Sequence, residues 1–215
     1  MHQNDLINEL KGFWQKLVFF YTGDIQLIEK CWAELLHYYT GPHRYYHNLN
    51  HVYSLIRFIE INKPHILNHH SLLFAAFYHD VIYEVTQKNN EALSAELAEK
   101  RLRELGVDEP IIALTVHIIN QTASHIKTDN FDINLFLDFD RCVLSGNEQE
   151  YFEYKDQIRK EYYIFNDSIY KTLRLRFLQR YLSQPEIYFT AINKGKEQIA
   201  RRNLERELQE LLLQV

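Results

Sequence analysis

The chain has 215 residues, and its 46% hydrophobic and 25% charged residues are ordinary for a folded globular protein, which excludes a disordered or fibrous one. Six Gly and four Pro, together under 5% of the chain, are too few for the tight turns of a β-sandwich or barrel, since average usage is about 12%. The net charge of −5 argues against binding to duplex nucleic acid, and two cysteines, Cys31 and Cys142, are too few for a disulfide framework, so we expect a cytoplasmic protein.

Apolar residues recur every three and four positions along most of the chain, which is the pattern of amphipathic helices. In chain order, we expect helices over residues 6–18, 25–39, 49–59, 71–83, 91–105 and 108–119, two short elements within 131–144, and helices over 148–163, 167–182 and 194–213. The stretch 71–83 is apolar on nearly all sides, so it is predicted to be a central, buried helix.

Local signals mark several helix ends. Asn48 is suited to cap the helix that starts after it, Gly106 to end a helix in the left-handed conformation, and Pro110 to begin the next helix. No internal repeat and no long linker divides the sequence. We therefore predict one all-α domain over residues 1–215, with nine or ten helices and a C-terminal helical extension.

Polar residues that can bind a metal ion stand within these apolar surroundings. His47 and His51 are four positions apart near the start of one predicted helix, so their side chains can reach a common site if both positions are helical. His79 and Asp80 end the most apolar stretch, where an imidazole beside a carboxylate needs a partner to offset its desolvation. Imidazole and carboxylate groups both bind divalent cations. Two further carboxylates lie in another apolar run, Asp138 and Asp140.

This ordered set resembles the HD-domain superfamily of metal-dependent phosphohydrolases, which is named for an adjacent His-Asp pair. The chain is similar in particular to a predicted phosphohydrolase family of bacterial cytosolic proteins, over essentially its whole length. The resemblance is carried by residues 44–51, 77–83, 136–140 and 200–208, together with Asn90, Glu91, Ser94, Thr122 and His125. It implies an HD-like helical bundle.

The resemblance also implies a role for each matching residue. The implied metal ligands are His51, His79, Asp80 and Asp140. His47 would donate a proton, because its spacing from His51 is similar to that in cyclic-nucleotide phosphodiesterases, where the first His is the donor. Asp140 is favoured as the ligand because a polar residue follows it, as in related sequences. Asp138 would then accept a hydrogen bond from a ligating His.

Further residues are expected around the substrate. Arg44 and Lys88 would hold its phosphate, although Arg44 could equally pair with an acidic residue at the surface. Glu91 would orient the attacking water or a His ligand. Thr122 and His125 fit the spacing of the family, and His125 with Glu91 could complete a second metal site.

The sequence thus predicts a metal-dependent phosphohydrolase that cleaves a small phosphate ester or nucleotide with metal-activated water. It would hold one divalent ion, either Mn, Fe, Ni, Co, Mg or Zn, or else two ions. The same residues also fit a non-catalytic metal or nucleotide sensor, an HD-type diiron oxygenase, and a buried polar network without metal. No membrane partner is expected, since the longest apolar run, 72–78, is far below the ~18 residues of a span. A homodimer is expected only because dimers are common.

Overall fold

The computed structural model describes residues 2–213 of the chain. Over that range it contains ten α-helices, three short 3₁₀ helices and no strand, which confirms the all-α prediction. The helices gather into two compact units, unit 1 ending at Ile126 and unit 2 starting at Lys127. The single domain expected over residues 1–215 stays a prediction. Within residues 2–213, no helix combines the length and apolar character that crossing a bilayer requires.

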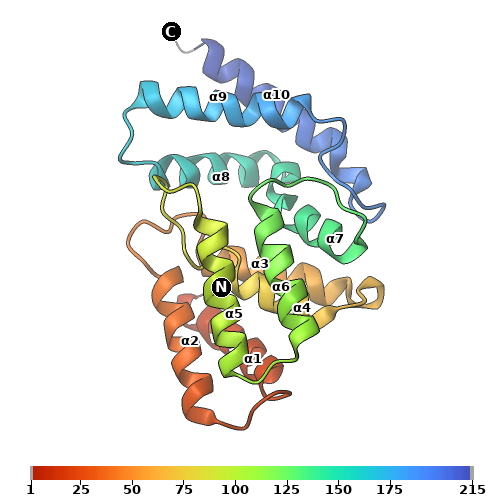
Figure 1. Cartoon of the computed structure of the whole chain (residues 1–215). Helices are drawn as coiled ribbons and strands as arrows, with labels where there is room; N and C mark the ends of the chain where they lie inside the picture. Colours follow the sequence, from red (N-terminus) through yellow and green to blue (C-terminus); the bar gives the residue numbers. More distant parts are fainter. Residues whose placement is uncertain (1, 214–215) are drawn as a thin grey trace. The chain divides into compact units, whose positions relative to one another are not determined.

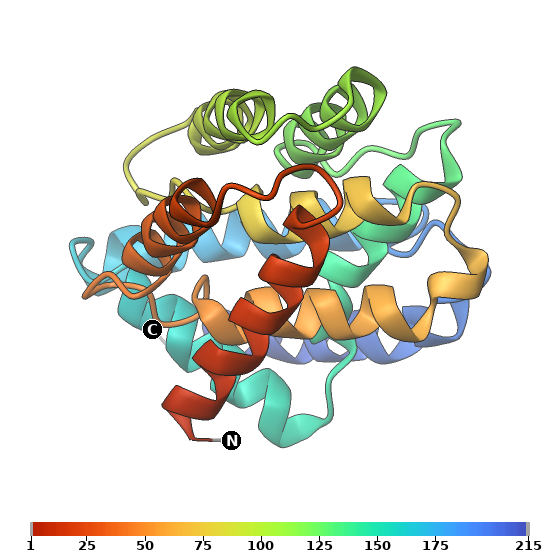
Figure 2. The same ribbon diagram turned by 90° about the horizontal axis from the view of Figure 1, so that it is seen from below.

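Unit 1 is built from six α-helices, several of which lie close to their predicted bounds. They are α1 (Gln3–Val18), α2 (Ile25–Tyr39), α3 (Leu49–Ile61), α4 (His69–Tyr78), α5 (Asn90–Glu104) and α6 (Glu109–Thr122), with a 3₁₀ turn at Lys63–His65. Helices α5 and α6 run side by side in Figures 1 and 2, and α4 packs against both α3 and α6. Helix α4 is therefore at the centre of unit 1.

The core of unit 1 surrounds α4, as the apolar pattern predicts. All residues from Ser71 to Tyr78 are buried. The indole of Trp14, on α1, packs edge-on against the rings of Phe74 and Phe77, with centroids 6.3 and 5.3 Å apart. Such aromatic packing adds to the free energy gained by burying apolar surface. It fixes α4, and with it the position of the residue at its C-terminal end, His79.

The predicted helix over 71–83 is too long at its C-terminal end, because α4 stops at Tyr78. The backbone N–H of Val81 donates to the carbonyl of Tyr78, which closes a tight turn. The N–H of Ile82 donates to the Ser94 hydroxyl on α5. A side chain far along the sequence thus takes the place of a helical partner, and the chain leaves the helix directly after His79.

Two glycines of unit 1 give a matched test of backbone conformation. Gly106, which follows α5, has φ of +72°, whereas Gly12 lies inside α1. A Cβ atom would meet nothing closer than 3.6 Å at Gly106 and nothing within 4 Å at Gly12. We expect Gly106→Ala to lower the free energy of unfolding by about 1–2 kcal/mol, because L-residues avoid the left-handed region. Gly12→Ala should raise it by about 0.5–1 kcal/mol. Urea denaturation measures both free energies of unfolding. Equal effects of the two substitutions would contradict the left-handed conformation of Gly106.

Unit 2 contains the remaining helices. They are α7 (Phe131–Asp140), α8 (Glu148–Glu161), α9 (Asp167–Ser183) and α10 (Glu197–Leu213), with 3₁₀ turns at Cys142–Ser145 and Lys194–Lys196. Helices α9 and α10 pack side by side. The last helix, expected from residue 194, begins as the 3₁₀ turn and becomes α-helical at Glu197. The Glu197 carboxylate accepts hydrogen bonds from the N–H groups of Ile187 and Tyr188, which fixes the preceding loop against α10.

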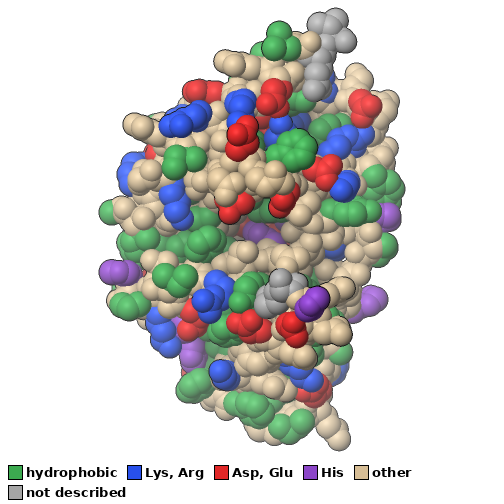
Figure 3. All heavy atoms as spheres, turned by 180° about the vertical axis from the view of Figure 1, so that it is seen from behind, with side chains coloured by type: hydrophobic (Ala, Val, Ile, Leu, Met, Phe, Trp, Pro, Cys, Tyr) green, Lys and Arg blue, Asp and Glu red, His purple; other side chains and the backbone are tan. Residues whose placement is uncertain are grey.

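Acidic and basic side chains are interspersed on the face drawn in Figure 3, without a large area of one sign. On α10 they form ion pairs. Arg201 pairs with Glu197 one turn away, and Arg206 pairs with Glu148 on α8. The exposed pair between Arg206 and Glu148 contributes at most about 1 kcal/mol. Acidic and basic side chains thus lie together on and beside α10.

Candidate metal centre

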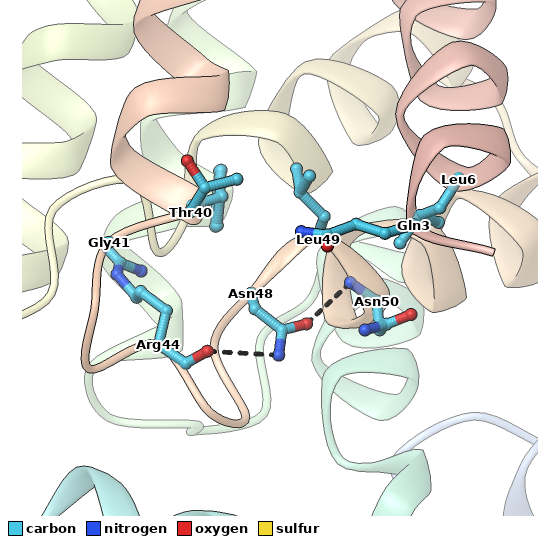
Figure 4. Close-up of a pocket in the computed structure, with 9 residues that line it drawn as sticks. Gln3, Leu6, Thr40, Gly41, Arg44, Asn48, Leu49 and Asn50 are labelled. Carbon is cyan, nitrogen blue, oxygen red and sulfur yellow. Dashed lines mark hydrogen bonds between the residues drawn. The ribbon is translucent and has the colours of Figure 1, made fainter.

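A short irregular segment carries His47 toward the start of α3. The side chain of Asn48 caps this helix, because its oxygen accepts from the N–H of Asn50 and its amide donates to the carbonyl of Tyr45. Figure 4 shows Asn48 beside Arg44 and Asn50 at the edge of a pocket of about 360 Å³. His47 therefore precedes α3, in line with the predicted helix start after Asn48, so the condition that both histidines be helical is not met. The turn nevertheless brings their ring centroids to 5.9 Å.

Three side chains of unit 1 converge at the end of α4. The Nε2 atoms of His51 and His79 are 3.0 Å apart. One oxygen of Asp80 lies 2.8 Å from Nε2 of His79 and 3.6 Å from Nε2 of His51. Both imidazoles are buried, with His51 8% and His79 1% exposed. Unit 1 thus assembles three of the four predicted ligands, which come from α3 and from the turn after α4.

The donor set of these three side chains fits a divalent cation. Metal bonds of about 2.1 Å at right angles place neighbouring ligand atoms about 3 Å apart, which is close to the separations of His79 from His51 and from Asp80, while His51 and Asp80 are 3.6 Å apart. An imidazole nitrogen carries at most one hydrogen, so a proton on His79 cannot point at both His51 and Asp80. A cation, in contrast, accepts a lone pair from each of the three atoms.

The charge of Asp80 also suits a cation. Burial acts to raise the pKa of its carboxyl, but electrostatic interaction with the imidazoles of His79 and His47 and the hydrogen bond from His79 outweigh burial and lower this pKa below its usual range. Asp80 is thus an anion at neutral pH. A half-buried anion beside two imidazoles supplies the negative charge that a divalent cation requires.

Arg44 contacts the backbone of the segments that carry His47 and Asp80. Its guanidinium donates to the backbone carbonyls of His47, Asp80 and Val81, at 3.0, 2.6 and 2.7 Å. These backbone contacts stand in place of the alternative pairing with a surface acid, and the role of Arg44 in holding phosphate stays a prediction.

Three residues without a predicted role hold the segment that follows the His-Asp pair. The ring of Tyr83 stacks on that of His47, with centroids 4.1 Å apart. Asn90 and Ser94, one turn apart on α5, bond to the backbone of Glu84 and Ile82. The available sequence signals were their place in the resemblance and their spacing of four residues on one helix face. It indicates neighbouring side chains but not the loop that they contact.

The two aspartates of α7 belong to unit 2. Asp138 is fully buried, and its oxygens accept from the N–H groups of Phe189 and Thr190 and from the Thr190 hydroxyl. These contacts give Asp138 a structural role within unit 2, unlike the predicted bond to a histidine. Asp140 is the last residue of α7 and is half-buried. Its role as the fourth ligand is part of the proposal below.

The other predicted site residues of unit 1 lie on or beside α5 and α6. Lys88 is exposed in the turn before α5, and Glu91 is half-buried in its first turn. The Thr122 hydroxyl donates to the carbonyl of Ile119 within α6. His125 has φ of +50° after α6. Among the described residues of unit 1, no second group of three metal-binding side chains forms, so His125 and Glu91 gain no support as a second site.

Comparison of the chain with protein-family models, with curated proteins and with solved structures gave no match.

Proposed function

We propose that the protein is a metal-dependent phosphohydrolase acting on a small phosphate ester or nucleotide. The observation that carries the proposal is the convergence of the two Nε2 atoms of His51 and His79 with an oxygen of Asp80. The class of reaction comes from the resemblance to the HD-domain superfamily, in which such a set binds the catalytic ion. The geometry supports the metal site, and the resemblance supports phosphate chemistry.

His51, His79 and Asp80 would hold the cation, and Asp140 is the predicted fourth ligand. A bound divalent cation supplies polarisation of a phosphoryl group and activation of water near neutral pH. Two nitrogen and two oxygen ligands leave positions for substrate and water. The Asp80 carboxylate, kept anionic by its neighbours, balances part of the charge of the cation.

His47 is placed to act on the leaving group. Its ring stacks on Tyr83 and lies 5.9 Å from the ring of His51, measured between centroids, while Nε2 of His51 is taken up by the ligand cluster. Among the described residues, His47 is not a member of the group of possible metal ligands, which fits a role beside the metal. Protonated His47 would donate its proton to the departing alkoxide oxygen as the P–O bond breaks.

Replacing His47 by Ala is expected to reduce turnover by about 10² to 10⁴-fold while the metal content stays at the wild-type level. Turnover is measured on the best ester found below, and metal by mass spectrometry of the purified protein. His65→Ala is the matched control, because His65 is an exposed imidazole in the 3₁₀ turn after α3. Loss of metal from His47→Ala would show that His47 is a ligand and would overturn its assignment as the acid.

The reaction class is tested on wild-type protein stripped of metal and reloaded separately with Mn²⁺, Fe²⁺, Mg²⁺ and Zn²⁺. We expect metal-dependent release of p-nitrophenol from its phosphate mono- or diester, or of phosphate from nucleotides. Oxygen consumption with iron in a two-to-one ratio would replace the proposal by a diiron oxygenase. Tight metal binding without turnover of any ester would replace it by a sensor.

A further inference from the structure

The two segments that carry His47 and Asp80 are joined through one guanidinium. Nη1 of Arg44 donates to the carbonyl of His47, three residues away, and to that of Asp80, 36 residues away. Nη2 donates to the carbonyl of Val81. All three acceptors lie outside α3 and α4, where carbonyls lack regular helical partners. Arg44 thus satisfies backbone groups on both sides of the ligand cluster at once.

The surroundings of Arg44 hold its side chain in one orientation. Its Cζ atom lies over the rings of Tyr39 and Tyr83, 5.3 and 5.5 Å from their centroids. Tyr83 in turn stacks on His47. The amide of Asn48 reaches back to the carbonyl of Arg44 at 3.4 Å. A cation between two aromatic rings is favoured by their quadrupoles, and a planar guanidinium suits this position better than an ammonium.

We propose that Arg44 is a positioning residue for the metal centre, an inference that rests on the proposed function. It fixes the segment bearing the predicted acid, His47, against the turn bearing the ligand Asp80. Because Asp80 directly follows the buried His79, fixing the backbone at Asp80 and Val81 sets where the carboxylate stands beside the imidazoles. A guanidinium can direct hydrogens to several carbonyls in one plane, whereas a lysine offers a single nitrogen.

Metal affinity in Arg44→Ala tests this inference. Changes to groups that orient metal ligands typically weaken metal binding ten- to hundredfold, and we expect a loss of about that size in competition with a chromophoric chelator, using Zn²⁺ alone. Arg44→Lys should recover only part of the affinity. Methylguanidinium should restore affinity to Arg44→Ala by occupying the place between Tyr39 and Tyr83, and methylammonium should not.

Arg101→Ala is the matched control, since Arg101 is another half-buried arginine of unit 1, paired with Glu34. Its removal should lower stability and leave zinc affinity unchanged. Hydrogen exchange of metal-free protein gives a second readout, in which Arg44→Ala should speed exchange in residues 45–50 and 80–84 together. Faster exchange in both segments with unchanged affinity would reduce Arg44 to a purely structural role and overturn the inference.

Zinc binding by wild-type protein tests the metal centre, and zinc binding by Arg44→Ala tests the positioning role of Arg44. If wild-type protein binds no metal, the metal centre itself is refuted, and the positioning role with it. If wild-type protein binds zinc but Arg44→Ala binds it equally well, the metal centre stands and only the role of Arg44 is refuted.

Discussion

Replacing His79 by Ala is expected to abolish metal binding. The wild-type protein, purified without chelator, should carry about one equivalent of a divalent metal. The variant should bind metal at least about a hundredfold more weakly, because changing a residue that only orients a ligand already weakens binding about ten- to hundredfold. His79 is the central member of the cluster, because its Nε2 lies 3.0 Å from that of His51 and 2.8 Å from the Asp80 carboxylate. Mass spectrometry of metal content and zinc titration measure the loss.

His65→Ala serves again as the exposed-histidine control and should keep the wild-type metal content. Thermal unfolding separates lost binding from lost folding, because metal bound only by the native state raises the melting temperature. Added metal should therefore stabilise wild-type protein and not His79→Ala. If the variant keeps the wild-type metal content, the metal binds elsewhere, and the cluster of His51, His79 and Asp80 is a polar network without metal. The same titration of Asp140→Asn and Asp138→Asn tests the fourth ligand.

The sequence was most informative where local chemistry decides the structure. The N-cap at Asn48, the left-handed Gly106 and the buried, mostly apolar α4 were all predicted and are all confirmed. The convergence of His51, His79 and Asp80 was predicted only through the resemblance, and the structure brings these three together. Periodicity alone could not supply it, because the ligands come from two segments that meet only in the tertiary structure.

Where the sequence misled, long-range contacts replaced local ones. The C-terminal end of α4 depends on Ser94, which bonds to Ile82 from another helix. The role of Arg44 depends on carbonyls 36 and 37 residues away. Because every residue has a backbone carbonyl, the sequence does not indicate which carbonyls accept these hydrogen bonds. Asp138 looked like a ligand or its neighbour because of its spacing. Its actual partners, two backbone N–H groups and a hydroxyl, lie more than 50 residues further on.

Unit 2 depends on a buried ion pair between α9 and α10. Glu207 accepts hydrogen bonds from Nε and Nη2 of Arg174, at 2.8 and 3.0 Å, and from the Tyr151 hydroxyl at 2.6 Å. The two charged side chains are 3% and 4% exposed. Burial and the negative charge of Glu207 raise the pKa of Tyr151 far above its usual value, so this hydroxyl stays protonated and donates.

Glu207→Gln is expected to lower the free energy of unfolding by about 3–5 kcal/mol, because it leaves Arg174 charged and buried without its counter-ion. Urea denaturation measures the loss. Glu148→Gln is the control: it removes the same charge from an exposed pair with Arg206 and should change stability by less than about 1 kcal/mol. Replacing Arg174 and Glu207 together by Met should recover most of the loss, since apolar groups of similar size leave no uncompensated charge. Equal effects of Glu207→Gln and Glu148→Gln would mean that water reaches Arg174, and that the pair is not the buried one described for α9 and α10.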